Sequence, residues 1–348
     1  MIPVFPSKTF PSHYSIVTGL YPGNHGIVSN NMRDSDWEGE FHLGTPEVVE
    51  GRWWGGEPIW TTAGRQGLIA ASFFWPGSDV LINGRRPRYY FAYDGAVPYE
   101  ERVDQVLAWL DLPDGERPSF ITLYFADPND TSHDVGPEAE EALAAVRRVD
   151  EMVGRLVDGL SRRGILEATN IVVTSDHGMA QMSEERVILL DQTGELAAHE
   201  VFEEGAFVQI FPDAGRETEI LEALRGSHPR LTVYAREEIP EALRLAGSPR
   251  LAPIIAVPDV GWTAHRGAGR AEPSGNFLQG NHGGDPQHPD MQGIFIAAGP
   301  SFLRGVRVPA FENVEVYNLL ARALGIEPAP NDGDLGRVEG ILRAPQNR

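Results

Sequence analysis

The chain contains no cysteine and a single lysine, Lys8, among its 348 residues. The lack of cysteine excludes disulfide bonds, a thiol nucleophile and thiolate ligands to a metal. No apolar run approaches the ~18 residues of a membrane-spanning helix, so we expect no transmembrane segment. The opening residues Met1-Ile2-Pro3-Val4 are not typical of a signal peptide.

Positive charge is also scarce. The 29 Lys and Arg residues face 50 Asp and Glu, which gives a net charge of -21. This charge argues against nucleic-acid duplexes and anionic membranes as partners. It leaves small phosphorylated substrates open, because a bound metal inverts the local charge. The apolar content of 41% supports a substantial core, and nothing in the sequence indicates an oligomeric state.

Residues 6–30 predict a loop that leaves a buried strand and enters a short helix. Pro11 suits the first helical position and Gly19 suits the helix end. Thr9 and the N–H of Phe10 are then expected at a helix N-terminus, where phosphate is stabilised. Thr9 is either a nucleophile, which needs a base or a metal, or an ordinary N-cap residue. Lys8 is either a phosphate contact or a solvated charge.

Polar side chains follow buried strands at further places along the chain. The apolar runs 119–125 and 170–174 both end in Asp- and His-rich loops, and a Gly-rich loop carries another histidine. The side chains concerned are Asn129, Asp130, His133, Asp176, His177 and His282. The strand ends of an α/β sheet are the usual place for an active site. Imidazole and carboxylate without thiolate favour catalytic zinc, with enough ligands for two ions.

Each of these groups also has an interpretation in which it has no catalytic or metal-binding role. Asp176-His177 is compatible with a hydrogen-bonded turn, and His133 and His282 with ordinary loop histidines. We interpret the remaining histidines as structural or solvated: His13, His25, His42, His199, His228, His265 and His288.

The hydrophobic pattern predicts a large α/β core and a smaller lobe inserted into it. Residues 138–163 have the strongest helical pattern, with an apolar stripe that starts at Leu143 and Val146. Short alternating segments between 187 and 275 indicate an inserted α+β lobe. The core is therefore assigned to residues 1–186 and 276–348, with a strand at 293–298 and a last helix at 314–324.

The opening segment Pro6-Ser7-Lys8-Thr9-Phe10-Pro11-Ser12-His13-Tyr14 resembles the signature of nucleotide pyrophosphatases/phosphodiesterases, a family of the alkaline phosphatase superfamily. The resemblance continues almost to the end of the chain, through residues 19–22, 25–26, 55–60, 175–179, 281–283, 299–302, 314–319 and 328–331. It implies an alkaline-phosphatase-like central sheet flanked by helices. Family members are often periplasmic or secreted.

The resemblance also implies a reaction. Nucleotide phosphodiester or pyrophosphate bonds are hydrolysed with two Zn²⁺ through a phosphothreonine at Thr9, which releases nucleoside monophosphate. The ligands expected for one zinc are Thr9, Asp176 and His177, and for the other Asn129, His133 and His282. Phe10 N–H and the Asn30 side chain are expected to donate to phosphoryl oxygens. The rings of Phe10 and Tyr124 are expected to stack on the substrate.

The chain departs from the family pattern at two points. Asn129 and Ser132 replace an aspartate ligand and a glycine, and Asp130 is a substitute ligand only if the loop shifts by one residue. We also expect the first strand of the sheet, with another zinc aspartate, to be missing before Thr9. Either the start codon is misassigned, which we favour, or the protein is a truncated form. Two alternative functions therefore stay open: a hydrolase of phospholipid-type diesters or phosphonates, and a weak or inactive phosphate-binding relative.

Overall fold

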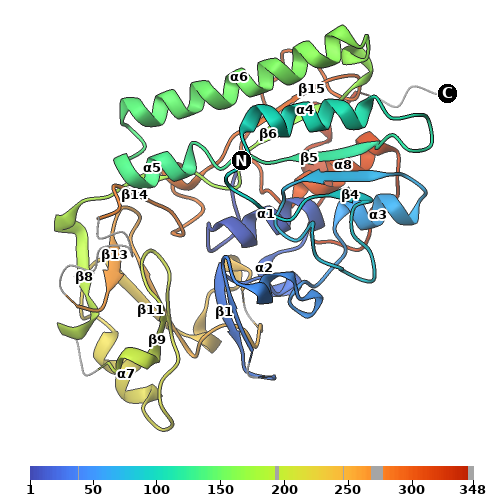
Figure 1. The fold of residues 1–348 in the computed structure, drawn as a ribbon. Coiled ribbons are helices and arrows are strands. Elements are labelled where there is room, and N and C mark those ends of the chain that lie inside the picture. The colour runs from blue at the N-terminus through green and yellow to red at the C-terminus, as the bar shows by residue number, and fades with distance from the viewer. Residues whose placement is uncertain (38, 193–195, 246, 268–276, 344–348) are drawn as a thin grey trace.

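The computed structural model describes residues 1–37, 39–192, 196–245, 247–267 and 277–343 (Figure 1). The helices are α1 Thr9–Thr18, α2 Pro22–His25, α3 Ile59–Arg65, α4 Tyr99–Leu110, α5 Asn129–Val135, α6 Glu140–Arg162, α7 Glu217–Leu224 and α8 Glu315–Leu324. The strands are β1 Asn31–Asp34, β2 Gly39–His42, β3 Ala70–Phe73, β4 Tyr89–Tyr90, β5 Phe120–Leu123, β6 Ile171–Thr174, β7 Ala180–Gln181, β8 Val187–Leu189, β9 Val201–Glu203, β10 Val208–Ile210, β11 Leu231–Ala235, β12 Ile254–Pro258, β13 Thr263–His265, β14 Gly280–Asn281 and β15 Phe295–Ala298. Among these residues, no helix is both long and apolar enough to cross a membrane.

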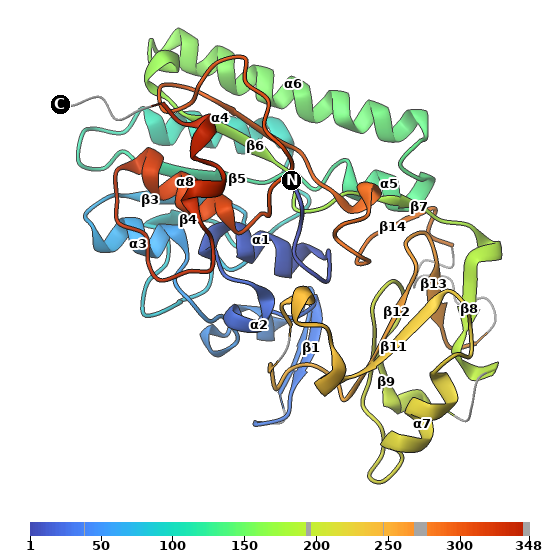
Figure 2. The ribbon, with the colours of Figure 1, turned by 180° about the vertical axis from the view of Figure 1, so that it is seen from behind.

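The parallel strands β4, β3 and β5 lie between helices (Figures 1 and 2). Helices α4 and α6 cover one side, and α3 and α8 lie on the other. All four residues of β3 are buried, as expected for a strand covered on both faces. The layers agree with the predicted α/β class.

Strand β6 pairs with β15 in an antiparallel ladder that is separate from the ladder of β5. Sequence analysis predicts one central sheet. Within the described ranges, no backbone ladder joins β6 to β5. Strand β6 leads into the loop that carries Asp176 and His177, as predicted. Strand β5 leads into α5, so Asn129, Asp130 and His133 lie on a short helix and not in the predicted loop.

Helix α1 begins at Thr9, two residues before the predicted start at Pro11. Lys8 is its N-cap, with an extended backbone, and Gly19 ends it with φ 67°. That left-handed conformation favours glycine and explains why the helix stops where predicted. Residues 10–18 are all buried, so the helix is fixed inside the core.

Helix α6 spans the predicted region, but its first turns face differently from the prediction. Ala142 and Ala145 are buried there, whereas Leu143 and Val146 are 45% and 48% exposed. The buried face of the first turns therefore starts one residue earlier than predicted, and the larger side chains of Leu143 and Val146 lie on the solvent side of the helix.

A second group of strands carries α7 and lies beside the core (Figure 2). Its sheet has the antiparallel order β11-β12-β10-β9, and β8 pairs in parallel with β13. Helix α7 is the α-helix of this predicted α+β region. We call residues 187–275 the inserted lobe. Its division from the core stays a prediction, and its boundary at 275/276 lies outside the described residues.

Candidate active site

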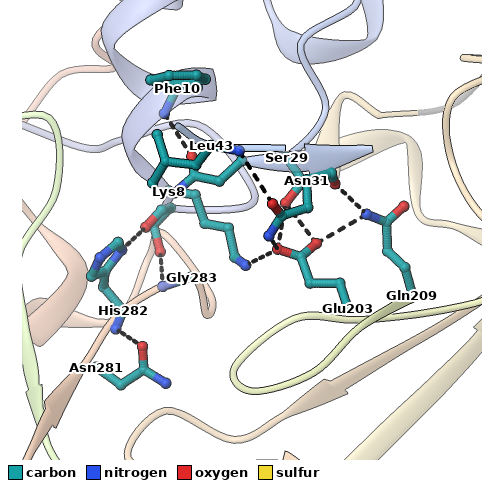
Figure 3. Close-up of polar contacts among 12 residues, drawn as sticks. Lys8, Phe10, Ser29, Asn31, Leu43, Glu203, Gln209, Asn281, His282 and Gly283 are labelled. Carbon is teal, nitrogen blue, oxygen red and sulfur yellow. Dashed lines mark hydrogen bonds and ion pairs between the residues drawn. The ribbon is translucent and has the colours of Figure 1, made fainter. Parts of the chain in front are cut away.

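The loop around Thr9 brings two predicted residues together. Phe10 N–H donates to Asn30 Oδ1 at 2.8 Å (Figure 3). Thr9 is the first residue of α1 and is half-buried, so it lies at the end where backbone N–H groups are unpaired within the helix. Because Asn30 accepts through its oxygen, the NH₂ group of its amide remains as the donor.

His13 connects this loop to the next strand end. Its Nδ1 lies 2.8 Å from the Thr9 carbonyl oxygen and 3.1 Å from Oδ2 of Asp176. Both partners only accept, so Nδ1 carries a hydrogen. We interpreted His13 from the sequence as structural or solvated. The structure instead makes this buried side chain a bridge between two predicted site residues.

Three predicted ligand histidines share one hydrogen-bonding pattern. Nδ1 of His133 contacts the Gly280 carbonyl, that of His177 the Gly178 carbonyl, and that of His282 the Ser7 carbonyl, each at 2.8 Å. A carbonyl oxygen accepts only, so Nδ1 carries a hydrogen in all three rings. In a neutral ring with that hydrogen, Nε2 presents a lone pair, and in His177 this Nε2 lies 3.0 Å from Asp176 Oδ2. The neutral ring with its hydrogen on Nδ1 is the tautomer that binds a metal through Nε2.

These imidazoles lie against one another. The ring centroids of His177 and His282 are 3.5 Å apart and nearly parallel, and those of His133 and His282 are 5.1 Å apart. Burial, followed by the neighbouring His177 and His133, holds the pKa of His282 well below its usual value. His282 is therefore neutral at pH 7, and its Nε2 lone pair is available.

Asp176 is the carboxylate of this cluster. Its Oδ2 lies 3.0 Å from Nε2 of His177 and is the same oxygen that contacts His13. Burial by itself raises the pKa of Asp176, but the adjacent His177 and His13 outweigh burial and hold it well below the usual value. For His13, burial lowers the pKa and the Asp176 charge outweighs it, so the net shift is upward. Asp176 is thus ionised at neutral pH.

Asn129 and His133 lie four residues apart on α5 and share one helix face. The Asn129 Nδ2 donates to Asp130 Oδ1 at 3.0 Å. The Oδ1 of Asn129 is buried without a hydrogen bond. A buried acceptor of this kind is normally satisfied, and a cation would satisfy it.

The donor chemistry therefore fits zinc: imidazole nitrogens in the right tautomer, one ionised carboxylate and one amide oxygen. Across the part of the chain that the structure describes, however, no three His, Asp or Glu side chains converge as a metal site. Asp176 is paired with His13 and His177, and position 129 carries an amide in place of a carboxylate.

Comparison with known proteins gives a consistent result. Residues 1–285 match the family described as type I phosphodiesterase / nucleotide pyrophosphatase. The chain belongs to this family. Rat ectonucleotide pyrophosphatase/phosphodiesterase family member 3 is 40% identical over 98% of the chain, and venom phosphodiesterase of Macrovipera lebetinus is 38% identical over 98%. The chain spans only about 40% of the length of these curated relatives.

The fold is also that of the family. Mouse ectonucleotide pyrophosphatase/phosphodiesterase 5 has a TM-score of 0.92 and 36% identity, over 99% of this chain and 90% of that one. The same values hold for an inactive variant of that protein, in which one threonine is replaced by alanine, solved in complex with AMP. The similarity confirms the predicted alkaline-phosphatase-like class.

The aromatic side chains predicted to stack on a substrate in this family lie apart. The ring of Phe10 is only 8% exposed and packs against Phe41 and Trp54. Tyr124 instead packs edge-on against His13, with ring centroids 5.4 Å apart. Sequence analysis missed Tyr93, whose ring lies 6.0 Å from that of Tyr124 and is 58% exposed. Its position in a loop after β4 gave no signal in the sequence.

Lys8 does not behave as a solvated charge, and that interpretation is wrong. Its side chain is 12% exposed and forms an ion pair with Glu203, a residue of the inserted lobe (Figure 3). The two residues are 195 positions apart in the sequence, so local pattern could not have paired them.

Proposed function

We propose that this protein is a metal-dependent phosphodiesterase that hydrolyses nucleotide diesters or pyrophosphates, with Thr9 as nucleophile. The shared hydrogen-bonding pattern of His133, His177 and His282 carries the proposal. Each imidazole holds Nδ1 on a backbone carbonyl, and the rings lie together, with the centroid of His282 3.5 Å from that of His177 and 5.1 Å from that of His133. Imidazoles held at Nδ1 in this way are typical of metal sites. His282 is hydrogen-bonded to the Ser7 carbonyl and His13 to the Thr9 carbonyl, so this region is connected to the segment of the proposed nucleophile.

We assign Thr9, Asp176 and His177 to one zinc ion, and Asn129, His133 and His282 to a second. When bound, zinc supplies positive charge for the phosphate and lowers the pKa of coordinated hydroxyl and water. His13 orients the Asp176 carboxylate from behind, which is a common supporting interaction at metal sites.

Thr9 Oγ1 attacks phosphorus, and the bond from phosphorus to the leaving group breaks. The proton of the Thr9 hydroxyl ends on the leaving group, and the nucleoside monophosphate is left esterified to Thr9. Water then cleaves the ester, which restores Thr9 and releases the monophosphate. Phe10 N–H and the Asn30 amide are the donors for the developing phosphoryl charge. For this, Phe10 N–H exchanges its bond to Asn30 Oδ1 for the phosphoryl oxygen.

The substrate class is supported by the relative solved with AMP, which is a nucleoside monophosphate. That relative is inactivated by loss of one threonine hydroxyl, which supports threonine chemistry in the family. We assign Tyr124 to contact with the base or leaving group, because aromatic stacking tolerates any base.

The test is release of nitrophenol from the nitrophenyl ester of thymidine monophosphate, with nitrophenyl phosphorylcholine as the competing substrate. We expect turnover of the nucleotide ester that EDTA removes and zinc restores. Preference for the choline ester would favour the phospholipid-type alternative. Zinc-independent turnover would overturn the metal-dependent mechanism. Absent turnover, by folded protein that still binds thymidine monophosphate, would overturn the proposal and favour a phosphate-binding relative.

Asn129 is the reason to test for absent turnover. A neutral amide oxygen binds zinc less strongly than a carboxylate, and it leaves the site with one negative charge fewer.

A further inference from the structure

Glu203 lies at the end of β9 in the inserted lobe and is 5% exposed. Its carboxylate forms the ion pair with Lys8 and accepts three further sets of hydrogen bonds (Figure 3). Ser29 Oγ donates to Oε2 at 2.7 Å and to Oε1 at 3.0 Å. Asn31 Nδ2 donates to Oε1 at 3.4 Å, and Gln209 Nε2 donates to Oε2 at 2.9 Å.

These donors occupy the acceptor sites of the Glu203 carboxylate. An ionised carboxylate has about four lone-pair sites, and Lys8, Ser29, Asn31 and Gln209 occupy them. No lone pair is left for a metal ion, and a carboxylate repels a substrate phosphate. The charge of Lys8, which directly precedes Thr9, is likewise neutralised within the protein. The network therefore affects the site by holding the segments next to Thr9 and Asn30 in place, and it does not contact the substrate.

The positions of the donors define what is held. Lys8 is the N-cap of α1 and fixes the turn that presents Thr9. Ser29 and Asn31 flank Asn30, whose amide contacts the N–H of Phe10. One buried carboxylate thus connects the segment of the proposed nucleophile with the segment of the proposed phosphoryl donor.

The lobe supports Glu203 from behind. Gln209 lies opposite Glu203 in the β9–β10 pair, and its Nε2 also donates to the Asn31 carbonyl at 2.9 Å. Residues of two lobe strands therefore contact the segment around Asn30, and Glu203 also contacts Lys8. Charge-assisted hydrogen bonds of a buried carboxylate are among the strongest in proteins and have well-defined geometry.

We propose that Glu203 is a positioning residue, through which the inserted lobe sets the separation of Thr9 and Asn30 and thereby the rate of phosphoryl transfer. This inference rests on the proposed function of Thr9. Displacement of a reacting group by about 1 Å can cost about 100-fold in rate. We therefore expect Glu203→Gln to lower kcat about 10- to 100-fold. Its KM should change less than about twofold, because substrate does not touch Glu203.

The chain offers a direct probe, because Lys8 is its only lysine. Protein labelled with ¹³Cε-lysine gives one lysine resonance, which reports the Lys8–Glu203 pair without any turnover. Hydrogen exchange of residues 7–12 and 27–33 reports how tightly the two loops are held. Glu204→Gln is the matched control. Its carboxylate, one residue further along, contacts His265 and the N–H of Arg266.

We expect Glu203→Gln to shift the Lys8 resonance, to accelerate exchange in both segments and to lower kcat, while Glu204→Gln matches the parent chain. Parent-like exchange and kcat in Glu203→Gln would overturn the inference. Faster exchange with unchanged kcat would also overturn it, since Glu203 would then be purely structural. If Glu203→Gln does not fold, Glu203→Asp carries the same test, because it keeps the charge but shortens the reach to Lys8. A parent chain without turnover would contradict the proposed function, whereas the resonance and exchange data would still test whether Glu203 holds both loops.

Discussion

His13 and Asp176 share a short contact, 3.1 Å between Nδ1 and Oδ2, that joins the first helix of the core to the end of β6. His13 also holds the carbonyl of Thr9 at 2.8 Å. One imidazole N–H is therefore shared between the residue proposed as nucleophile and a carboxylate proposed as metal ligand. Both side chains are buried, so water does not replace the contact at low cost.

We predict that His13→Gln lowers kcat about 10- to 100-fold, because supporting residues of metal ligands typically contribute that much to metal affinity or activity. Zinc affinity should fall with it, measured by competition with a chromogenic chelator. His199→Gln is the control, since His199 is exposed and contacts Asp213 in the inserted lobe. Equal activity and zinc affinity in the His13 variant and the parent chain would contradict the bridging role.

Asn129→Asp should strengthen zinc binding by at least about tenfold, because it replaces a neutral oxygen with a carboxylate at a position that faces the same way as His133. Isothermal titration with zinc measures the change. Asp130→Asn serves as the comparison and should leave the affinity within about twofold. If Asp130→Asn weakens binding instead, the neighbouring carboxylate is the ligand, and our assignment of position 129 is wrong.

His25 makes stability depend on pH. Burial, with a smaller effect from Arg250, lowers the pKa of His25 to about 3. Unfolded histidine titrates near 6.5. Between these values the unfolded chain binds one proton more, so this site makes the free energy of unfolding fall as pH falls from about 6.5 toward 3, by up to about 1.4 kcal/mol per pH unit.

His25→Asn should remove this contribution. Asparagine can still accept from the N–H of Ile27, as Nδ1 of His25 does at 3.1 Å. Urea unfolding at pH 7, 6 and 5 should give a pH slope smaller by about one proton than that of the parent chain. Identical slopes would mean that His25 is not the group that titrates.

Arg250 connects the inserted lobe to the core through a buried ion pair with Asp34, 2.9 Å from Nε to Oδ2. Its guanidinium also donates to the carbonyls of Gly26, Trp53 and Arg52. We predict that Arg250→Met destabilises the fold by about 3–5 kcal/mol, because it leaves Asp34 buried and unpaired. The free energy of unfolding in urea measures this.

The matched surface pair is Arg304 with Glu167, at 79% and 84% exposure. Arg304→Met should cost less than about 1 kcal/mol. A similar loss in both variants would show that the Arg250 network contributes no more than a surface pair.

The sequence allowed prediction of what depends on local pattern. The ends of buried runs indicated His133, Asp176 and His177, and a Gly-rich loop indicated His282. The structure brings the rings of His133, His177 and His282 together. Gly19 was predicted as a helix end for a similar local reason. The zinc assignment itself stays a prediction.

Pairings between distant segments could not be predicted. Lys8 and Glu203 are 195 residues apart, and the local sequence around either residue does not indicate the other. His13 looked like one more helix residue, because its role depends on how α1 lies against the end of β6. The tautomers of His133, His177 and His282 depend on carbonyls that only the folded backbone brings near. For these features, tertiary contact decides and sequence pattern does not.

Thr9→Ala and Thr9→Ser, assayed with the nitrophenyl ester of thymidine monophosphate in the presence of zinc, test the proposed chemistry most directly. We predict that Thr9→Ala loses at least about 1,000-fold in turnover while circular dichroism shows an intact fold, and that Thr9→Ser keeps measurable activity because it retains a hydroxyl. Turnover of Thr9→Ala within about tenfold of the parent chain would show that Thr9 is not the nucleophile.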